Sequence, residues 1–449
     1  MNNNDLEEKV LKGQQKRSHR ELFIVAAILL LAAIAAGAAY YYTYKNYVII
    51  GNKIYDRDIT EITLSGSDIE DYSVLCRFYN LQSADLRGQD ITAEQYDEIS
   101  AMLDNVKIEW LVPINGCKYD CLTENFLITP DIAADQLQYL KYLTKLKHVD
   151  SEYYPLCDEL YEIRERLVSD SDGTFVCKAK IYDIEIDDTT AELVLNNIQI
   201  TDLTDLHNAI RFFPNIKKFE MCECGLSDET MGSLRNQYPD LNFVWTVKFL
   251  HYTVRTDALV FSTLVDVGDS FDGTQEDFSP LFRYCTELRA LDLGHHYITD
   301  ISEIVNLKHL QVLILADNRI EDISPLAELK ELHYLELFSN RFTDVSPLTK
   351  LENLQDLNIC FNRRITNPTE LTKCSKLNRL YISGCSLSQW EKNTLINGLP
   401  YGCELNTDAE NAVKNGWRDN RKNAAIRRTF YRWQKVTEYQ DWAHVTYAS

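Results

Sequence analysis

The stretch LQVLILADNRIEDISPL, residues 310–326, contains a complete change of chain direction. Leu313 and Leu315 alternate with their neighbours in the two-residue period of a β-strand, whose side chains point in turn to opposite faces. Asn318 follows where the alternation stops, and Pro325 comes later, where a residue without a backbone N–H suits a segment outside a sheet ladder. Taken alone, the stretch predicts one short strand followed by a corner.

The same string recurs along the C-terminal half of the chain. Aligned copies succeed one another after 22, 22, 22 and 23 residues, and they begin at Leu288, Leu310, Leu332, Leu354 and Leu377. Their shared frame is LxxLxLxxNxI followed by xD(I/V)SPL. One such coil cannot bury its own apolar side, so the repeat predicts a solenoid of stacked coils. We expect the side-chain amides of Asn318, Asn340 and Asn362 to bond free backbone groups of adjacent coils.

This motif, over residues 288–387, resembles the leucine-rich repeat family, and specifically its 22-residue, internalin-like class found on bacterial surfaces. The resemblance implies an α/β fold: a leucine-rich repeat solenoid with a curved parallel sheet and a helical or irregular convex side. His296 and Cys385 stand at the Asn position. The family tolerates Cys there, whereas His296 departs from the pattern and is expected to change the hydrogen bonding of its coil.

Residues 47–246 carry a longer and more degenerate repeat. The segments 91–110 and 226–245 align without gaps at an offset of 135, and each predicts an amphipathic helix followed by a strand. Capping-box spacings, in which Ser or Thr precedes Glu or Gln by three residues, mark helix starts at Thr92 and Ser388. We predict three super-repeats of about 65 residues in this region, built from degenerate coils of the same family.

One segment near the N-terminus predicts a membrane helix. Residues 22–42 contain no charge, and about 20 apolar residues suffice to cross the hydrocarbon core of a bilayer. Tyrosines at 40–44 suit the membrane interface, and the Lys and Arg before the helix place residues 1–21 in the cytoplasm. The alternative is a cleaved signal peptide with AGA at 36–38 as its small-residue site. The long preceding segment and the tyrosines favour a retained signal anchor, and hence a single-pass cell-membrane protein with an extracellular C-terminal ectodomain.

The predicted organisation has six parts: a cytoplasmic segment at 1–21, the transmembrane helix at 22–42, degenerate super-repeats at 47–246, a connecting segment at 247–287, regular coils with a C-terminal helix–strand unit at 288–406, and a basic aromatic tail at 407–449. The tail carries eight Lys or Arg between Lys414 and Lys435 against one acidic residue. We favour a role as a cap on the last coil over contact with anionic polymers, lipid headgroups or nucleic acid.

Composition excludes some functions. With 46 Lys and Arg against 68 Asp and Glu, the net charge of −22 makes nucleic acid and anionic lipid poor partners for the whole molecule. No phosphate loop, nucleophile elbow or HExxH motif occurs, so neither an enzyme nor a cofactor is predicted.

The twelve cysteines invite a disulfide framework, but several occupy positions of the repeat that point inward. Cys224 and Cys385 stand at Asn positions, and we predict that they are buried as small hydrophobic residues. CKYDC at 117–121 is too short a pattern to predict zinc, which needs four ligands, and a disulfide between its two cysteines is left open. No metal site is predicted.

The inner face of the sheet is the predicted recognition surface. Its positions in the LxxLxLxx frame should be mainly polar because they face solvent, yet they form an apolar and aromatic stripe with a charged edge. The alternative explanation is that strands favour Val, Ile, Tyr and Phe anyway. We predict that these residues contact a protein or peptide partner, with a glycan as a further option: Val312, Ile314, Asp317, Tyr334, Glu336, Phe338, Phe361, Arg379 and Tyr381. The competing hypothesis is a structural envelope scaffold with no specific groove ligand.

Overall fold

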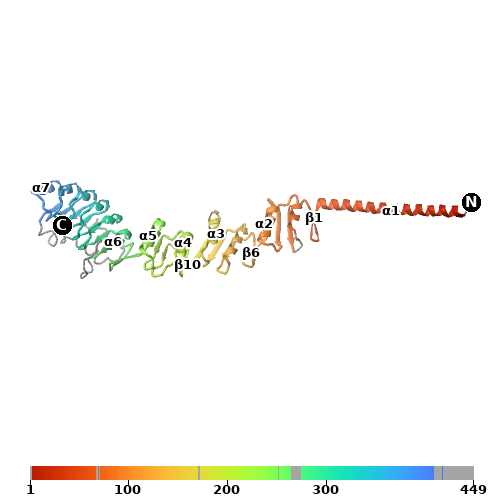
Figure 1. The fold of residues 1–449 in the computed structure, drawn as a ribbon, viewed down its shortest axis with the longest axis horizontal. Helices are drawn as coiled ribbons and strands as arrows, with labels where there is room; N and C mark the ends of the chain where they lie inside the picture. The colour runs from red at the N-terminus through yellow and green to blue at the C-terminus, as the bar shows by residue number, and fades with distance from the viewer. Residues whose placement is uncertain are drawn as a thin grey trace. The chain divides into compact units, whose positions relative to one another are not determined.

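The computed structural model describes residues 3–66, 69, 71–169, 172–250, 252–263, 275–408 and 417. The chain forms two compact units, Met1–Lys180 and Ile181–Ser449. Parallel sheets of short strands, connected by helices and turns, build both units (Figure 1).

The first unit begins with one long helix and continues as short strands. Its elements are α1 (Asn3–Asn46), β1 (Tyr47–Ile50), β2 (Lys53–Asp56), β3 (Glu61–Ser65), η1 (Tyr72–Arg77), β4 (Ser83–Gly88), α2 (Ala93–Met102), β5 (Lys107–Glu109), β6 (Leu111–Ile114), β7 (Cys117–Asp120), β8 (Asn125–Ile128), η2 (Ala134–Tyr142), β9 (His148–Glu152), α3 (Asp158–Ser169) and β10 (Thr174–Ile181), where η is a 3-10 helix. Strands β3, β4 and β5 pair in parallel, as do β8, β9 and β10. The antiparallel hairpins β1–β2 and β6–β7 come immediately before these two sheets in the sequence.

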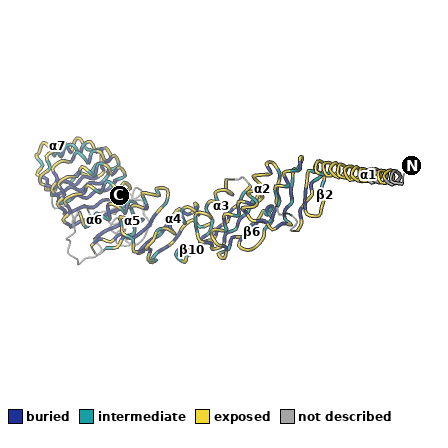
Figure 2. The backbone as a smooth tube through the Cα atoms, turned by 45° about the vertical axis from the view of Figure 1, so that its right-hand side comes forward, coloured by how far each residue is buried: buried dark blue, intermediate teal, exposed yellow. Residues whose placement is uncertain are grey.

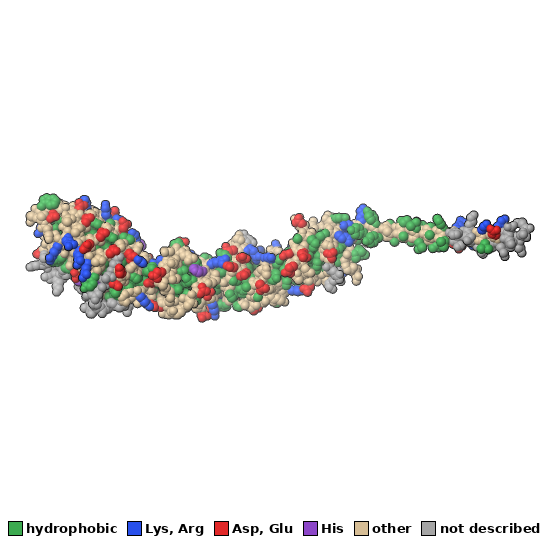
Figure 3. Space-filling model, viewed as in Figure 1, with side chains coloured by type: hydrophobic (Ala, Val, Ile, Leu, Met, Phe, Trp, Pro, Cys, Tyr) green, Lys and Arg blue, Asp and Glu red, His purple; other side chains and the backbone are tan. Residues whose placement is uncertain are grey.

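Helix α1 contains the predicted membrane segment. Its part from Arg20 to Asn46 is long and apolar enough to cross a membrane, and none of it is buried in the protein. Figure 3 shows apolar side chains along the exposed helix and Lys and Arg side chains where it meets the first strands. A membrane span and a signal sequence both fit these properties.

Two arginines tie the end of α1 to the first coil. Arg57 Nη1 donates to the carbonyls of Tyr44 and Lys45, at 3.4 Å each, and Arg77 Nη2 donates to Tyr44 O at 3.4 Å. The last carbonyls of a helix have no partner within it and carry partial negative charge, so two guanidinium groups there both satisfy and stabilise the helix end.

The second unit contains the regular array. Its elements are β11 (Ile184–Asp187), β12 (Glu192–Val194), α4 (Thr204–Phe212), β13 (Lys218–Glu220), α5 (Asp228–Gln237), β14 (Asn242–Val244), β15 (Thr246–Phe249), β16 (Tyr252–Arg255), β17 (Val260–Ser262), α6 (Gln275–Tyr284), β18 (Ala290–Asp292), η3 (Ser302–Asn306), β19 (Val312–Ile314), η4 (Ser324–Glu328), β20 (Tyr334–Glu336), η5 (Ser346–Lys350), β21 (Asp356–Asn358), η6 (Pro368–Lys373), β22 (Arg379–Tyr381), α7 (Gln389–Gly398) and β23 (Glu404–Asn406). Strands β17 to β23 form one seven-stranded parallel sheet in sequence order.

The register of this sheet stacks equivalent repeat positions. Leu291 pairs with Leu313, which pairs with Leu335, and the column continues through Leu357 and Leu380. Strands β17 to β22 are buried along their whole length, while the turns around the array are exposed (Figure 2). The core therefore runs as a continuous leucine column, and the expected stacking of coils is confirmed.

The asparagine of the frame links each coil to the one before it. Nδ2 of Asn318, Asn340 and Asn362 donates to the carbonyl of Leu293, Leu315 and Leu337 respectively, at 2.8, 2.9 and 2.9 Å. Oδ1 of Asn362 in turn accepts from the backbone N–H of Asn340 at 3.0 Å. The expected bonds between adjacent coils are therefore confirmed.

Cysteine at the same position replaces the amide donor with a thiol. Cys385 Sγ lies 3.1 Å from Ile359 O. Ile359 occupies the repeat position that Leu293, Leu315 and Leu337 hold in the preceding coils. In the degenerate region, Cys224 Sγ lies 3.1 Å from Leu195 O. His296 is buried and its Nε2 bonds Thr263 Oγ1 at 2.9 Å, so this coil has the different hydrogen bonding expected of it.

The D(I/V)SPL part of the frame builds the start of η4 and of η5. The carboxylate of Asp322 accepts from Ser324 N at 2.8 Å and from Ser324 Oγ at 2.9 Å, and Asp344 bonds Ser346 in the same way. Proline then occupies the first turn of η4, where its missing N–H removes no hydrogen bond.

The predicted connecting segment at 247–287 contributes regular structure of its own. It forms the hairpin β15–β16, strand β17 of the seven-stranded sheet, and α6. Within it, the stretch SFDGTQEDFSP at 270–280 predicts a surface loop from its Asp, Gly and Pro, but this is wrong from Gln275 onward, where α6 starts. Phe278, Leu281 and Phe282 lie three and four residues apart and are all fully buried, which explains the helix.

Candidate ligand-binding face

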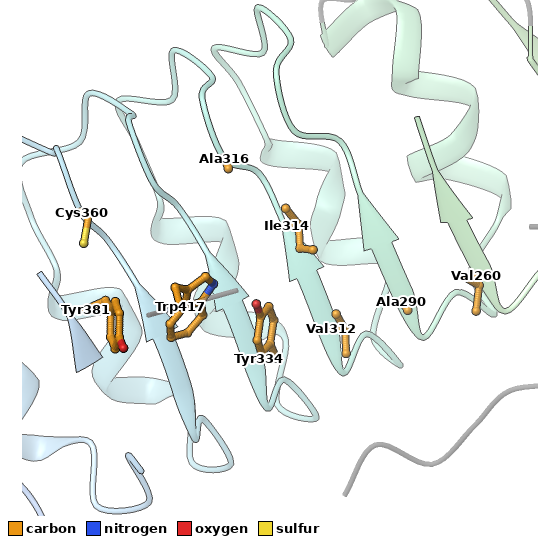
Figure 4. Packing of buried hydrophobic residues seen from close by; sticks show 9 residues of the cluster. All are labelled: Val260, Ala290, Val312, Ile314, Ala316, Tyr334, Cys360, Tyr381 and Trp417. Carbon is orange, nitrogen blue, oxygen red and sulfur yellow. The ribbon is translucent and has the colours of Figure 1, made fainter. Parts of the chain in front are cut away.

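One face of the seven-stranded sheet carries a cluster of buried apolar side chains, on the side away from the 3-10 helices (Figure 4). We call it the concave-face cluster, and its members are Val260, Ala290, Val312, Ile314, Ala316, Tyr334, Cys360, Tyr381 and Trp417. All but one come from coils of the array. Trp417 instead follows the last strand, β23, by more than ten residues.

The cluster covers most of the predicted recognition surface. Six of the nine predicted residues are buried: Val312, Ile314, Tyr334, Glu336, Arg379 and Tyr381. Phe338 and Phe361 are half-buried at its margin, and Asp317 is exposed. The expectation that the six face solvent is therefore wrong, and Trp417 packs against three of them, Tyr334, Arg379 and Tyr381. Their role in binding a partner remains a prediction.

Trp417 contacts Tyr334, Tyr381 and Arg379 on the face. Its ring centroid lies 5.2 Å from that of Tyr334 and 5.1 Å from that of Tyr381, and Figure 4 shows the indole between the two. The Arg379 guanidinium carbon lies 3.8 Å from the indole centroid, and Arg379 Nη1 donates to Trp417 O at 3.1 Å. Trp417 is 0% exposed. Side chains on strands β20 and β22 thus contact both the ring and the backbone of Trp417.

A buried ion pair supports Arg379. Its Nε lies 3.1 Å from Asp356 Oδ1, on the neighbouring strand β21, and the two side chains are only 3% and 0% exposed. The pair fixes the guanidinium plane, because an arginine held by a carboxylate on one edge keeps the other edge oriented for a second acceptor. Here the second acceptor is the Trp417 carbonyl.

The two tyrosines are held as neutral phenols. Burial raises the pKa of Tyr334 well above its usual value, with the nearby Glu336 adding to the effect, and the Tyr334 hydroxyl donates to Glu336. Burial, then the hydrogen bond to Glu404, raises the pKa of Tyr381 to about 12, and its hydroxyl lies 2.6 Å from Glu404 Oε1. Both hydroxyls stay protonated at neutral pH, so each fixes the ring that flanks the indole.

Phe338 and Phe361 form the margin of the cluster beside the indole site. Their ring centroids are 5.2 Å apart in an edge-to-face arrangement. Phe361 has a φ of +61°, in the left-handed region that disfavours bulky residues. A side chain at Gly384 would lie 2.7 Å from the Phe361 ring, so the absence of one leaves room for the ring. The strained Phe361 is held in place by the coil that follows it.

The remaining candidate groups are separate from one another. All twelve cysteines fall within the described residues and are free thiols; Cys121 is buried and Cys117 is exposed. His295 lies 3.1 Å from Asp317, whereas His296 points into the core. Within the described ranges, no group of three His, Cys, Asp or Glu side chains is arranged to hold a metal ion.

Sequence reasoning missed Trp417 as a member of this face. The tail was assigned to a cap on the last coil, and apart from Trp417 the residues from 409 onward lie outside the described part of the chain. The only available signal was an aromatic residue in a chain segment that fits no repeat position.

The fold is that of a leucine-rich repeat protein. Residues 308–350 match the family model described as leucine rich repeats (2 copies). That match spans less than a tenth of the chain, and the remaining coils are recognised by their geometry. Leucine-rich repeat proteins generally mediate protein–protein recognition and are typically not enzymes.

Several solved structures resemble the chain at low sequence identity. An internalin, InlF, from Listeria monocytogenes is 19% identical over 80% of this chain and 84% of its own, with a TM-score of 0.28. A leucine-rich repeat protein of Leptospira interrogans is 14% identical over 78% of this chain and 90% of its own, with a TM-score of 0.26. The ectodomain of the receptor kinase SOBIR1 from Arabidopsis thaliana is 21% identical over 35% and 92%, with a TM-score of 0.25. No curated protein matches the chain. Assignment to the 22-residue internalin-like class stays a prediction.

Proposed function

We propose that this chain is a membrane-anchored surface protein whose leucine-rich repeats recognise a segment of polypeptide on the concave face. The observation that carries the proposal is the seating of Trp417. An aromatic side chain enters between two tyrosines while an oriented arginine binds the backbone carbonyl of the same residue. Aromatic anchors with an arginine at their edge are the composition of protein recognition sites.

A polypeptide suits this site better than a glycan. The Arg379–Trp417 hydrogen bond uses a main-chain carbonyl, which every peptide offers, and the ring contacts supply the apolar area that binding requires. Helix α1 supports the location, since the apolar run from Arg20 to Asn46 carries exposed tyrosines at its end. A structural scaffold without a specific ligand remains the second candidate. The burial of the concave-face cluster favours it, because a face that the chain itself covers needs no external ligand.

Membrane topology is testable with the chain's own thiols. Residues 1–75 contain no cysteine, and Cys76 and Cys117 are exposed. We expect a membrane-impermeant maleimide to label both thiols on intact cells. The core cysteines should react only after denaturation because burial raises their pKa, to about 11 for Cys374 and about 12 for Cys385, and blocks access. Mass spectrometry counts and locates the labels.

The matched control is the variant Cys76→Ser with Cys117→Ser, which should lose the labels at these two positions while keeping its thermal midpoint. Labelling that appears only after the cells are permeabilised would refute an extracellular ectodomain.

Partner capture tests the concave face. We expect Phe338→Asp to reduce cross-linked partner on intact cells at least tenfold, because it places a charge at the half-buried margin of the cluster without removing a fully buried side chain. Cross-linking followed by purification of the full-length chain measures the yield. Trp390→Asp is the control, since Trp390 is an exposed aromatic on α7 away from the sheet face. Equal yields from both variants and the wild type would favour the scaffold.

A further inference from the structure

The residue that covers the concave-face cluster does not belong to the coils that build it. Strands β17 to β23 complete the sheet, and their backbone ladder runs without Trp417. The last strand, β23, ends at Asn406, and Trp417 lies over β22 and β20, one and three strands back into the sheet. A cap on the last coil would instead cover β23.

The contacts of Trp417 are those of a bound residue. Two tyrosine rings, one guanidinium group and one hydrogen bond to its backbone carbonyl hold Trp417 on the face, and these contacts come from residues that other residues of the array already orient. Asp356 positions Arg379, Glu404 bonds Tyr381, and Glu336 bonds Tyr334. The site is therefore preorganised by the array itself, which is what a ligand site requires.

The charge on this face favours a basic segment. The two register columns that contain Tyr334 and Tyr381 carry four carboxylates against the single Arg379, namely Asp292, Glu336, Asp356 and Glu404. Trp417 stands within KNGWRDNRK, residues 414–422, which has four basic residues and one acidic residue. Opposite charges on the concave face and on the bound segment disfavour other partners and set the register of binding.

We infer that the concave face is a site for a tryptophan-bearing basic peptide, and that Trp417 is its internal ligand, which a partner segment of the same chemistry must displace. The inference rests on the proposed recognition function and adds the class of ligand and its regulation. Tethering gives an internal ligand an effective concentration of roughly millimolar. A partner therefore binds only when it outcompetes the tail, and removing the Trp417 side chain opens the site.

The test uses a fluorescent peptide of residues 411–423, NAVKNGWRDNRKN, and the full-length chain in detergent micelles. We expect the Trp417→Ala chain to bind this peptide at least tenfold more tightly than the wild-type chain does, measured by fluorescence anisotropy. A peptide of the same charge with alanine in place of tryptophan is the control, and it should bind neither chain. Equal affinity of the two chains, or a folded Trp417→Ala chain that ignores the peptide, overturns the inference.

A second measurement needs no variant. The wild-type chain is labelled uniformly with ¹⁵N, so that its Trp417 can be told apart from the tryptophan of the peptide. Excess unlabelled peptide should raise hydroxyl-radical oxidation of Trp417 at least fivefold, because the fully buried indole becomes exposed when it leaves the face. Unchanged oxidation at saturating peptide also overturns the inference.

The two proposals can fail separately. If the peptide binds as expected but no cellular partner is captured, the internal ligand is supported and the recognition function is refuted. If partner capture depends on Phe338 but the peptide has no effect, the recognition function is supported and the internal ligand is refuted.

Discussion

Replacing Asp356 with alanine is expected to lower the free energy of unfolding of the regular array by about 3–5 kcal/mol, because it leaves the buried Arg379 without its carboxylate partner. The two side chains are 3% and 0% exposed, so water cannot replace the lost carboxylate. Urea titration of the full-length chain, followed by tryptophan fluorescence, measures the change.

The double variant Asp356→Leu with Arg379→Met should lose much less stability than Asp356→Ala, since no charge remains buried. Glu328→Ala is the matched control. It removes a carboxylate 3.7 Å from Lys308 in a pair whose side chains are more than half exposed, and such pairs contribute about 0–1 kcal/mol. An Asp356→Ala chain as stable as Glu328→Ala would contradict the ion pair described here.

Replacing Asn362 with alanine should cost about 2–4 kcal/mol of unfolding free energy. Asn362 is 0% exposed, its Nδ2 donates to Leu337 O and Ile359 O at 2.9 and 2.8 Å, and its Oδ1 accepts from Asn340 N. Alanine removes these bonds and leaves the buried Asn340 N–H without its acceptor, which is the expensive part of the loss. The shift in the urea midpoint is the measurement.

Two further substitutions sharpen this result. Asn362→Cys should recover part of the stability, because the Cys385 thiol shows that sulfur can donate to the equivalent carbonyl. Asn353→Ala removes another coil-to-coil amide bond, to Lys330 O at 2.9 Å, but in contact with water, so it should cost less than about 1 kcal/mol. Identical losses for Cys and Ala at position 362 would mean that the thiol bond contributes nothing.

The sequence was enough to predict the regular array because each coil repeats its physical constraints. Three positions at fixed intervals show this. Leu313 is buried in the core, Asn318 bonds the preceding coil, and Asp322 starts the 3-10 helix, as their places in the repeat predict. The capping boxes at Thr92 and Ser388 are also confirmed, since both are local patterns that need no knowledge of tertiary packing.

Contacts between distant segments were not predictable in the same way. A strand pattern gives the face on which Tyr334 lies but not what covers that face, and Trp417 is 83 residues further along the chain (417 minus 334). The helix α6 was missed for a related reason. Its apolar residues Phe278, Leu281 and Phe282 lie in a segment whose Asp, Gly and Pro favour a loop, and burial against the array overrides that local preference.

The free thiols have a mechanical consequence. In the described residues, which include every cysteine, no covalent cross-link joins one coil to the next. Under a pulling force, a 22-residue coil can therefore unravel from the array and release roughly 75 Å of extended chain before its neighbour gives way. The protein can thus lengthen stepwise under tension, and the strength of each step is set by hydrogen bonds such as those of Asn318, Asn340 and Asn362.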